Sequence, residues 1–281
     1  MPSRNPLIDP IKSTIRRQVV SLFNDARNGE APVVRCDHAL FERDGVVWRV
    51  HGDVGTMMVG GIASLLMQML HPSVLAGVWD HSNFRQDMHG RLRRTARFIA
   101  MTTYGDKSAA NAAIDAVRRV HDRVGGTLPD GTPYSANDPE LLAWVHVTET
   151  SSFLDAWIRY GEPRMSAADQ DRYFAQMARI GAALGADPVP RSRAEARRII
   201  AAMRPQLSVD DRTREVCRLI LDGRGAPPMA EMPRKLAMQA AVDLLPPWAR
   251  AMHGRSVSPF ERPLVRAGTF GVAQTLRWAF R

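Results

Sequence analysis

Apolar residues recur every three or four positions along most of the chain, with polar and charged residues between them. This spacing puts the apolar side chains on one face of a helix and predicts a succession of amphipathic helices. The predicted helices cover residues 5–28, 56–70, 75–78, 91–104, 108–124, 139–157, 166–185, 193–203, 213–221 and 236–245, with a further helical region after residue 246. The one β signal is Asp44-Gly45, which is typical of a hairpin turn between Phe41 and Val46. The sequence therefore predicts an all-α fold in which any sheet is small.

Several of these helices carry capping signals. We expect N-caps at Thr56, Asp138, Ser166 and Ser192, and helix ends at Gly125-Gly126 and Gly185. The helix over 56–70 also has a face of small residues that includes Gly60 and Gly61. Each glycine inside a helix costs roughly 1 kcal/mol relative to alanine. We therefore expect this face to allow close approach of a neighbouring backbone.

Composition excludes several classes of protein. With 281 residues, 45% hydrophobic and 24% charged, the chain can form a substantial globular core. Cys36 and Cys217 are the only cysteines, so neither a disulfide framework nor a cysteine zinc cluster is expected. The N-terminus has no signal-peptide core and no 18-residue apolar window occurs. We expect a cytoplasmic protein without a transmembrane span, although a cysteine-poor exported protein and peripheral membrane contact stay open.

Charge is distributed unevenly. Residues 191–281 contain 17 Arg/Lys and 8 Asp/Glu, a net charge of +9, whereas residues 1–190 contain 21 of each. Nucleic acid, acidic lipid and solvent are all possible partners of a basic segment. Acidic residues interrupt the arginines, and no aromatic residues are interleaved with them. We therefore interpret them as solvated helix faces and expect no nucleic-acid partner.

Familiar catalytic motifs are absent, including GxGxxG after a strand, a P-loop, HExxH and GxSxG. Polar residues are instead concentrated between residues 68 and 99, where His71, His81 and His89 occur. These histidines lack the i, i+4 spacing of a helical zinc site. In the helix over 91–104, a period of 100° per residue puts Arg91, Arg94, Thr95 and Phe98 on one face that points inward, and Arg93 and Arg97 on an opposite, solvated face.

The helix over 108–124 has a histidine on its apolar stripe, where His121 follows Ile114 and Val117. A buried neutral imidazole facing an arginine- and threonine-bearing helix suits a haem, whose iron takes such a ligand. A core histidine bonded to a backbone carbonyl explains the same position. The residues alone do not decide between these interpretations.

Several short motifs follow one another in a set order. They are Gln68-x-x-His71-Pro72, Gly77-Val78-x-x-His81-Ser82-x-Phe84, Gly90-Arg91-Leu92-x-Arg94-Thr95, Val117-Arg118-x-Val120-His121-x-x-Val124-x-Gly126 and Tyr134-x-Ala136-x-Asp138-Pro139-x-Leu141-Leu142-x-Trp144-Val145-His146. This order resembles the oxygenase MpaB / latex-clearing protein family. On that resemblance we divide the chain into an N-terminal helix and connecting loop (1–44), a helical oxygenase domain (45–255) and a basic C-terminal tail (256–281).

The resemblance implies a single globin-like, multi-helix domain around a haem b pocket. It implies that His121 is the iron ligand and that Arg91, Arg94 and Thr95 line the other side of the haem. Arg94 and Thr95 would then stabilise oxygen-derived charge, and Arg91 would pair with a haem propionate. Small apolar, unsaturated substrates and dioxygen are the implied partners.

Two departures from the family pattern change the chemistry expected of the site. A lysine that ligates iron in latex-clearing proteins is replaced by Arg94, and a guanidinium stays protonated and is a poor metal ligand. Their catalytic glutamate also has no evident counterpart, the nearest ionisable residues being Asp80 and His81. Cleavage of polyisoprene is therefore not expected, whereas oxidation of a smaller apolar substrate is.

Alternatives remain for individual histidines and for the function. His146 is the rival iron ligand, with a structural contact to Glu149 as its other interpretation. His81 either anchors a loop or lies at the pocket as a catalytic residue, and His71 is expected to cap a helix end. The competing functions are a haem or apolar-ligand carrier without turnover, and a helical interaction protein whose histidines are structural.

Overall fold

The computed structural model describes residues 8–24, 29–222 and 228–280 of the chain. It is 70% helical, with thirteen α-helices and one small two-stranded sheet within these ranges. The prediction of an all-α fold is therefore confirmed, whereas the globin-like arrangement stays a prediction.

The helices are α1 (Ile8–Phe23), α2 (Val46–His51), α3 (Val54–Gln68), α4 (Pro72–His81), α5 (Met88–Tyr104), α6 (Lys107–His121), α7 (Pro139–Tyr160), α8 (Ala167–Leu184), α9 (Arg193–Met203), α10 (Asp211–Asp222), α11 (Pro228–Leu244), α12 (Pro247–Met252) and α13 (Arg262–Phe280). A short 3-10 helix, Arg204–Gln206, follows α9. Strands β1 (Gly125–Thr127) and β2 (Pro133–Ser135) pair antiparallel.

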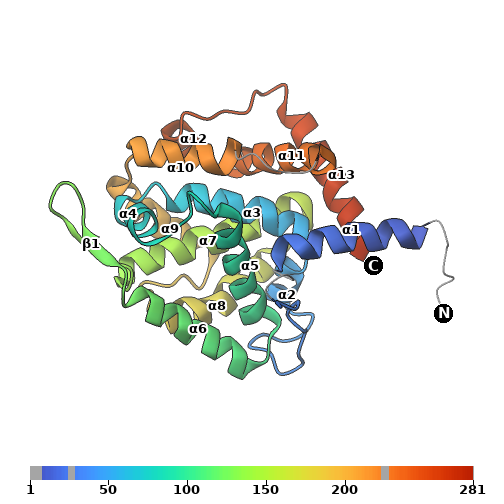
Figure 1. Cartoon of the computed structure of the whole chain (residues 1–281), viewed down its shortest axis with the longest axis horizontal. Helices are drawn as coiled ribbons and strands as arrows, with labels where there is room; N and C mark the ends of the chain where they lie inside the picture. Colours follow the sequence, from blue (N-terminus) through green and yellow to red (C-terminus); the bar gives the residue numbers. More distant parts are fainter. Residues whose placement is uncertain (1–7, 25–28, 223–227, 281) are drawn as a thin grey trace.

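Helices α3 and α7 lie side by side at the centre of the fold (Figure 1). Most of α7 is buried, and Trp144, Val147 and Leu154 are almost fully enclosed. The indole Nε1 of Trp144 donates to the carbonyl of Gln68 at the end of α3, at 3.3 Å. Helices α11 and α13 pack against α3, and α8 and α9 pack against α7. The hydrophobic core is therefore built around this central pair.

The close approach of the two central helices occurs at Gly60. A Cβ atom at Gly60 would lie 2.9 Å from the Cα of Phe153 and 2.9 Å from the carbonyl oxygen of Ser152, both on α7. At Gly61 a Cβ would meet only the ring of Phe153, at 3.7 Å. The close backbone approach expected from the small-residue face is confirmed.

Three of the four expected N-caps are confirmed. The side chains of Asp138, Ser166 and Ser192 accept hydrogen bonds from backbone N–H groups in the first turns of α7, α8 and α9. The expected cap at Thr56 is wrong, because α3 begins two residues earlier and Asp53 accepts the hydrogen bond from the N–H of Thr56. Gly185 ends α8 in the left-handed conformation, as expected.

The predicted hairpin at Asp44-Gly45 is wrong. Asp44 does turn the chain, with φ at +61°, but Val46 and the residues after it form α2 and are buried there. The two strands instead occur at 125–127 and 133–135, so Gly125-Gly126 lies in β1. Helix α6 ends before them, with Asp122 at its C-cap position.

The C-terminal segment predicted as a basic tail forms a helix docked on the core. Helix α13 packs against α1, α3, α7 and α11. A Cβ at Gly55 would lie 3.3 Å from the Cα of Ala273, so the start of α3 touches α13 closely. Arg277 of α13 pairs with the carboxylate of Asp53 and donates to the carbonyl of Tyr160 at 2.8 Å. These contacts join α13 to both central helices.

In the described part of the chain, no single helix is long and apolar enough to cross a membrane. Helices α3 and α4 reach the necessary length and apolarity only together, and the chain bends by 105° at the break between them.

Alanine at the two central glycines should have opposite effects. Gly60→Ala is expected to lower the free energy of unfolding by about 1–3 kcal/mol, because its methyl group overlaps backbone atoms of α7. Gly61→Ala should be neutral or raise it by up to about 1 kcal/mol, since the site has room and alanine favours the helix. Urea unfolding followed by circular dichroism measures both. Equal effects of the two substitutions would contradict the close contact at Gly60.

Candidate functional site

The predicted site residues belong to α4, α5 and α6. Asp87 caps α5 by accepting from the N–H of Gly90 at 2.8 Å, and Asp106 caps α6 by accepting from the N–H of Ser108 at 2.8 Å. Helices α5 and α6 pack against each other. Arg91 and His121 are therefore on neighbouring helices, although the residues that line the pocket at Arg91 do not include His121.

Arg91 lines a small apolar pocket. The pocket has a cavity volume of only about 10 Å³, which is room for about one water molecule. Its lining residues are Leu65, Met69, Val78, Phe84, Met88, Arg91, Val216 and Ile220. Seven of these eight side chains are apolar, so the guanidinium is the only charged group of the lining. The surroundings are apolar with one cation, and an apolar group larger than a water molecule enters only if the lining side chains move apart.

The guanidinium of Arg91 is half-buried, and its side chain makes no hydrogen bond or ion pair with any described residue. Burial lowers its pKa, and the neighbouring charge of Arg94 lowers it further. A cation in such surroundings favours an anionic partner, because desolvation of an unpaired charge is costly. Arg91 is therefore the residue of α5 best placed to bind a carboxylate.

The predicted inward face of α5 is only partly correct. Arg94 and Thr95 are exposed: Arg94 lies 3.7 Å from the carboxylate of Asp87, and the Thr95 hydroxyl donates to the carbonyl of Arg91 at 3.2 Å. Arg97, predicted to be solvated, donates to the carbonyl of Ala31 at 2.9 Å. Helix α1 packs on α5, which periodicity alone does not reveal. The catalytic roles assigned to Arg94 and Thr95 stay predictions.

Four of the eight histidines have structural partners. His51 is bonded through Nδ1 to Thr103 and through Nε2 to the hydroxyl of Tyr173, each at 2.8 Å. Nε2 of His253 donates to the carbonyl of Leu66 at 2.8 Å. The other two are His71 and His81, described below.

His71 and His81 hold loops in place. The Nε2 of His71 lies 3.1 Å from the amide oxygen of Gln206, and His71 is the N-cap residue of α4 without a side-chain capping bond. The expected hydrogen bond of His71 at the helix end is made by its backbone, whose N–H donates to the carbonyl of Gln68 at 3.2 Å, and not by its ring. His81 donates from Nε2 to the carbonyl of Gly125 at 3.0 Å and is exposed. The anchoring interpretation of His81 is thus supported, and its catalytic role stays a prediction.

Of the remaining four histidines, His38 and His89 are exposed. His121 and His146 are the two less exposed histidines whose rings make no hydrogen bond to any described residue. These are the two candidate iron ligands of the sequence analysis. Histidines of this kind are unusual, because buried polar atoms are nearly always paired.

His121 ends α6 and is half-buried, on the face shared with Ile114 and Val117. Its Nδ1 is buried without a partner among the described residues. Burial lowers the pKa of the imidazole, and the carboxylate of Asp122 opposes that effect. The ring is therefore neutral at pH 7, which is the form that binds a metal ion.

His146 lies deeper, between α7 and α8. Its Nε2 is buried without a partner in the described ranges, and burial lowers its pKa to about 4. The ring is closely packed, since a Cβ at Gly181 would lie 2.8 Å from its Cδ2. No hydrogen bond joins His146 to Glu149, so the expected contact between them is wrong. Glu149 is itself unpaired among the described residues, and burial raises its pKa to about 7.

No group of three or more His, Cys, Asp or Glu side chains in the described part of the chain could hold a metal ion. A haem requires only one or two protein ligands, so its donor set can be met by a single neutral histidine. His121 and His146 each fit this chemistry, and Arg91 fits the carboxylate of a propionate.

Comparison with protein families gives one match. The family described as "ER-bound oxygenase mpaB/B'/Rubber oxygenase, catalytic domain" matches residues 48–278. The match extends past residue 255 and includes most of α13. Searches of curated proteins and of solved structures found no match.

Acid should destabilise the protein through its buried histidines. Burial lowers the pKa of His51 to about 3 and that of His146 to about 4, whereas both approach 6.5 on unfolding. Unfolding therefore takes up protons below pH 6.5, so stability is full above that pH and is lost as the pH falls toward 4. Each proton contributes a slope of about 1.4 kcal/mol per pH unit.

Glutamine takes up no proton on unfolding. In the variant His51→Gln, the free energy of unfolding should therefore fall less steeply between pH 6 and pH 4, by about 1.4 kcal/mol per pH unit, than in the unmodified protein. Urea unfolding at several pH values measures it. His89→Gln, at an exposed position, is the matched control and should keep the slope of the unmodified protein. An unchanged slope in His51→Gln would show that His51 does not resist protonation.

Proposed function

The chain belongs to the mpaB/rubber oxygenase catalytic-domain family, and from this premise we propose that it is a haem b-dependent oxygenase acting on a small apolar, unsaturated substrate. The family consists of oxygenase catalytic domains, which supports oxygenase activity in general. The cofactor, the substrate class and the roles of individual residues are our proposal.

The observation that carries the proposal is the unpaired imidazole of His121. A buried nitrogen without a partner is costly unless a ligand satisfies it. His121 is neutral, is less buried than His146, and lies on the helix next to the one that carries Arg91. We therefore propose His121 as the iron ligand, with His146 as its rival.

When bound, haem supplies activation of dioxygen at its iron. His121 holds the cofactor, and Arg91 orients it by pairing with a propionate. The apolar lining beside Arg91 would contact the hydrocarbon part of the substrate once its side chains move apart, because the present cavity holds about one water molecule. Arg94 would donate N–H groups to oxygen-derived charge. Thr95 would donate its hydroxyl there after releasing the carbonyl of Arg91, to which it donates at 3.2 Å. Arg94 acts as a donor only, since a guanidinium stays protonated.

We further propose a cytoplasmic location. Cys36 and Cys217 are both free thiols, as a reducing compartment would maintain them. The alternative of an interaction protein using a basic surface is less favoured, because acidic side chains pair with arginines along the C-terminal third, as in Arg214–Asp211, Arg234–Glu231 and Arg255–Asp222.

Haem binding and its ligand can be tested by absorption spectroscopy. Protein purified with haem, or reconstituted with haemin, should show a Soret band that His121→Ala largely removes. His253→Gln is the control, because glutamine can still donate to the carbonyl of Leu66. Circular dichroism must show that each variant is folded. Loss of the band in His146→Ala alone would assign the ligand to His146, and absence of the band in the unmodified protein would refute the cofactor.

Two substitutions on α5 should separate binding from turnover. Arg91→Gln is expected to weaken haem binding about tenfold, or about 1.4 kcal/mol, by removing a half-buried cation. Arg94→Gln should leave haem affinity unchanged and lower the rate of oxygen uptake on the order of tenfold to a hundredfold. An oxygen electrode with isoprenoid or unsaturated fatty substrates measures the rate. Equal effects of both variants on haem affinity would contradict these separate roles.

A further inference from the structure

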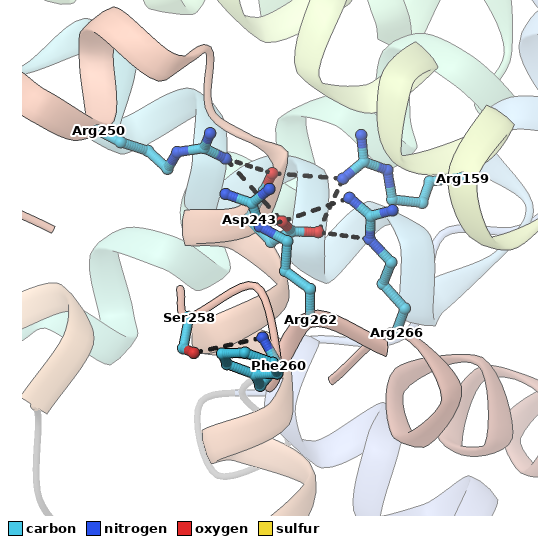
Figure 2. A network of polar contacts seen from close by, with 7 residues as sticks. All are labelled: Arg159, Asp243, Arg250, Ser258, Phe260, Arg262 and Arg266. Carbon is cyan, nitrogen blue, oxygen red and sulfur yellow. Dashed lines mark hydrogen bonds and ion pairs between the residues drawn. The ribbon is translucent and has the colours of Figure 1, made fainter. Parts of the chain in front are cut away.

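Four arginines surround one buried carboxylate on the α11–α13 side of the fold. Asp243 lies near the end of α11, and its side chain is fully buried. Figure 2 shows that the arginines point toward it from three other helices. They are Arg159 of α7, Arg250 of α12, and Arg262 and Arg266 of α13. In Figure 1 helices α11, α12 and α13 lie on the opposite side of the central helices from α6, so this cluster is separate from the candidate oxygenase site.

The carboxylate and the backbone carbonyl of Asp243 accept most of the hydrogen bonds. Arg159 donates to the carboxylate at 2.9 Å and to the carbonyl at 3.3 Å. Arg266 donates to the carboxylate at 2.8 Å and 3.4 Å, and Arg250 donates to the carbonyl at 3.1 Å. Two arginines are therefore enough to satisfy the carboxylate, and the two others are in excess.

Arg262 and Arg250 are the arginines in excess. The Nε of Arg262 lies 3.2 Å from Asp243 but is buried without a hydrogen-bond partner in the described residues. Arg250 is only 15% exposed and comes no closer than 3.9 Å to the carboxylate in its ion pair. Burial and the charge of Arg262 lower the pKa of Arg250. Both guanidiniums retain N–H donors that no described acceptor uses.

Little else in the described ranges balances this charge, since Asp155 interacts electrostatically with Arg159 but forms its ion pair with Arg193. Four guanidiniums and one carboxylate leave a formal charge of +3, and Glu261, next to Arg262, makes no ion pair with any of the four. Like charges at this separation repel, more strongly where water is partly excluded. The side chains of Arg262 and Arg266 are 36% and 46% exposed, so the cluster is accessible from solvent.

We propose that this cluster binds a phosphate group. A phosphate offers several oxygens and up to two negative charges, and arginine recognises it with paired N–H donors. It would offset the excess charge and satisfy the free donors of Arg262 and Arg250. A phosphoester or inorganic phosphate and a phospholipid headgroup provide the same chemistry. The lipid source is included because Phe260 and Leu264, on either side of Arg262, are 91% and 74% exposed.

Calorimetric titration of the full-length protein with inorganic phosphate, at constant ionic strength set by chloride, tests the site. Saturable binding is expected, and Arg262→Gln should weaken it at least tenfold. Arg255→Gln is the matched control: it removes the same charge from the same segment, but Arg255 pairs with Asp222. Arg262→Lys, which keeps the charge but loses the paired donors, provides a second variant if Arg262→Gln does not fold. Binding equally strong in Arg262→Gln would overturn the proposal, and so would absence of saturable binding together with absence of vesicle binding that depends on Arg262.

Vesicles distinguish the two sources of phosphate. Co-sedimentation is measured with phosphatidylcholine vesicles, with and without phosphatidic acid. Binding that requires phosphatidic acid, and that both Arg262→Gln and Phe260→Ser reduce, would assign the site to a lipid headgroup. Phosphate binding in the calorimeter without co-sedimentation would assign it to a soluble phosphate compound. Co-sedimentation that Arg262→Gln leaves unchanged, together with no phosphate binding, would refute the cluster as the site.

Discussion

The contact between the backbones of α3 and α7 at Gly60 is the constraint on which the rest of the structure depends. Because no side chain separates the helices there, they form one central unit with two outer surfaces. Helices α11 and α13 cover one side of it, and α8 and α9 cover the other. Both ends of α3 are also bonded to neighbours: Asp53 pairs with Arg277 of α13, and Gln68 accepts from Trp144 of α7. A close backbone contact thus sets the positions of the four covering helices, and α8 in turn packs against α6, which carries His121.

Buried imidazoles have two different roles in this fold. His51 is paired at both nitrogens, and His253 is paired at one, so these rings join helices far apart in the sequence. His121 and His146 share the neutral state imposed by burial but lack such partners in the described ranges. A protein interior that leaves a polar atom unpaired loses stability unless water, an ion or a ligand supplies the missing partner. This contrast, together with the family, supports the proposed cofactor site.

The two sides of the molecule differ in how their arginine side chains are paired. Near α5 a single half-buried guanidinium, that of Arg91, lies in an apolar lining without a described partner. Around Asp243 several guanidiniums compete for one carboxylate. Desolvation penalises the first arrangement, and repulsion between like charges penalises the second. Both arrangements favour an anion. The surroundings of Arg91 are apolar, whereas those of Asp243 are strongly cationic, so the two sites suit ligands of different polarity.

The sequence by itself determined whatever depends on interactions within one or two helical turns. Asp138, Ser166 and Ser192 cap their helices as predicted, and periodicity put His121 on the less exposed face of α6. Tertiary structure alone decided what covers each face. It exposed Arg94 and Thr95, placed residue 31 against Arg97, and turned the chain into α2 where a hairpin was expected. His51 bonds to residues 52 and 122 positions away, and Arg159 to one 84 positions away. Helical spacing shows which residues share a face, but partners so distant are brought together only by the packing of whole helices.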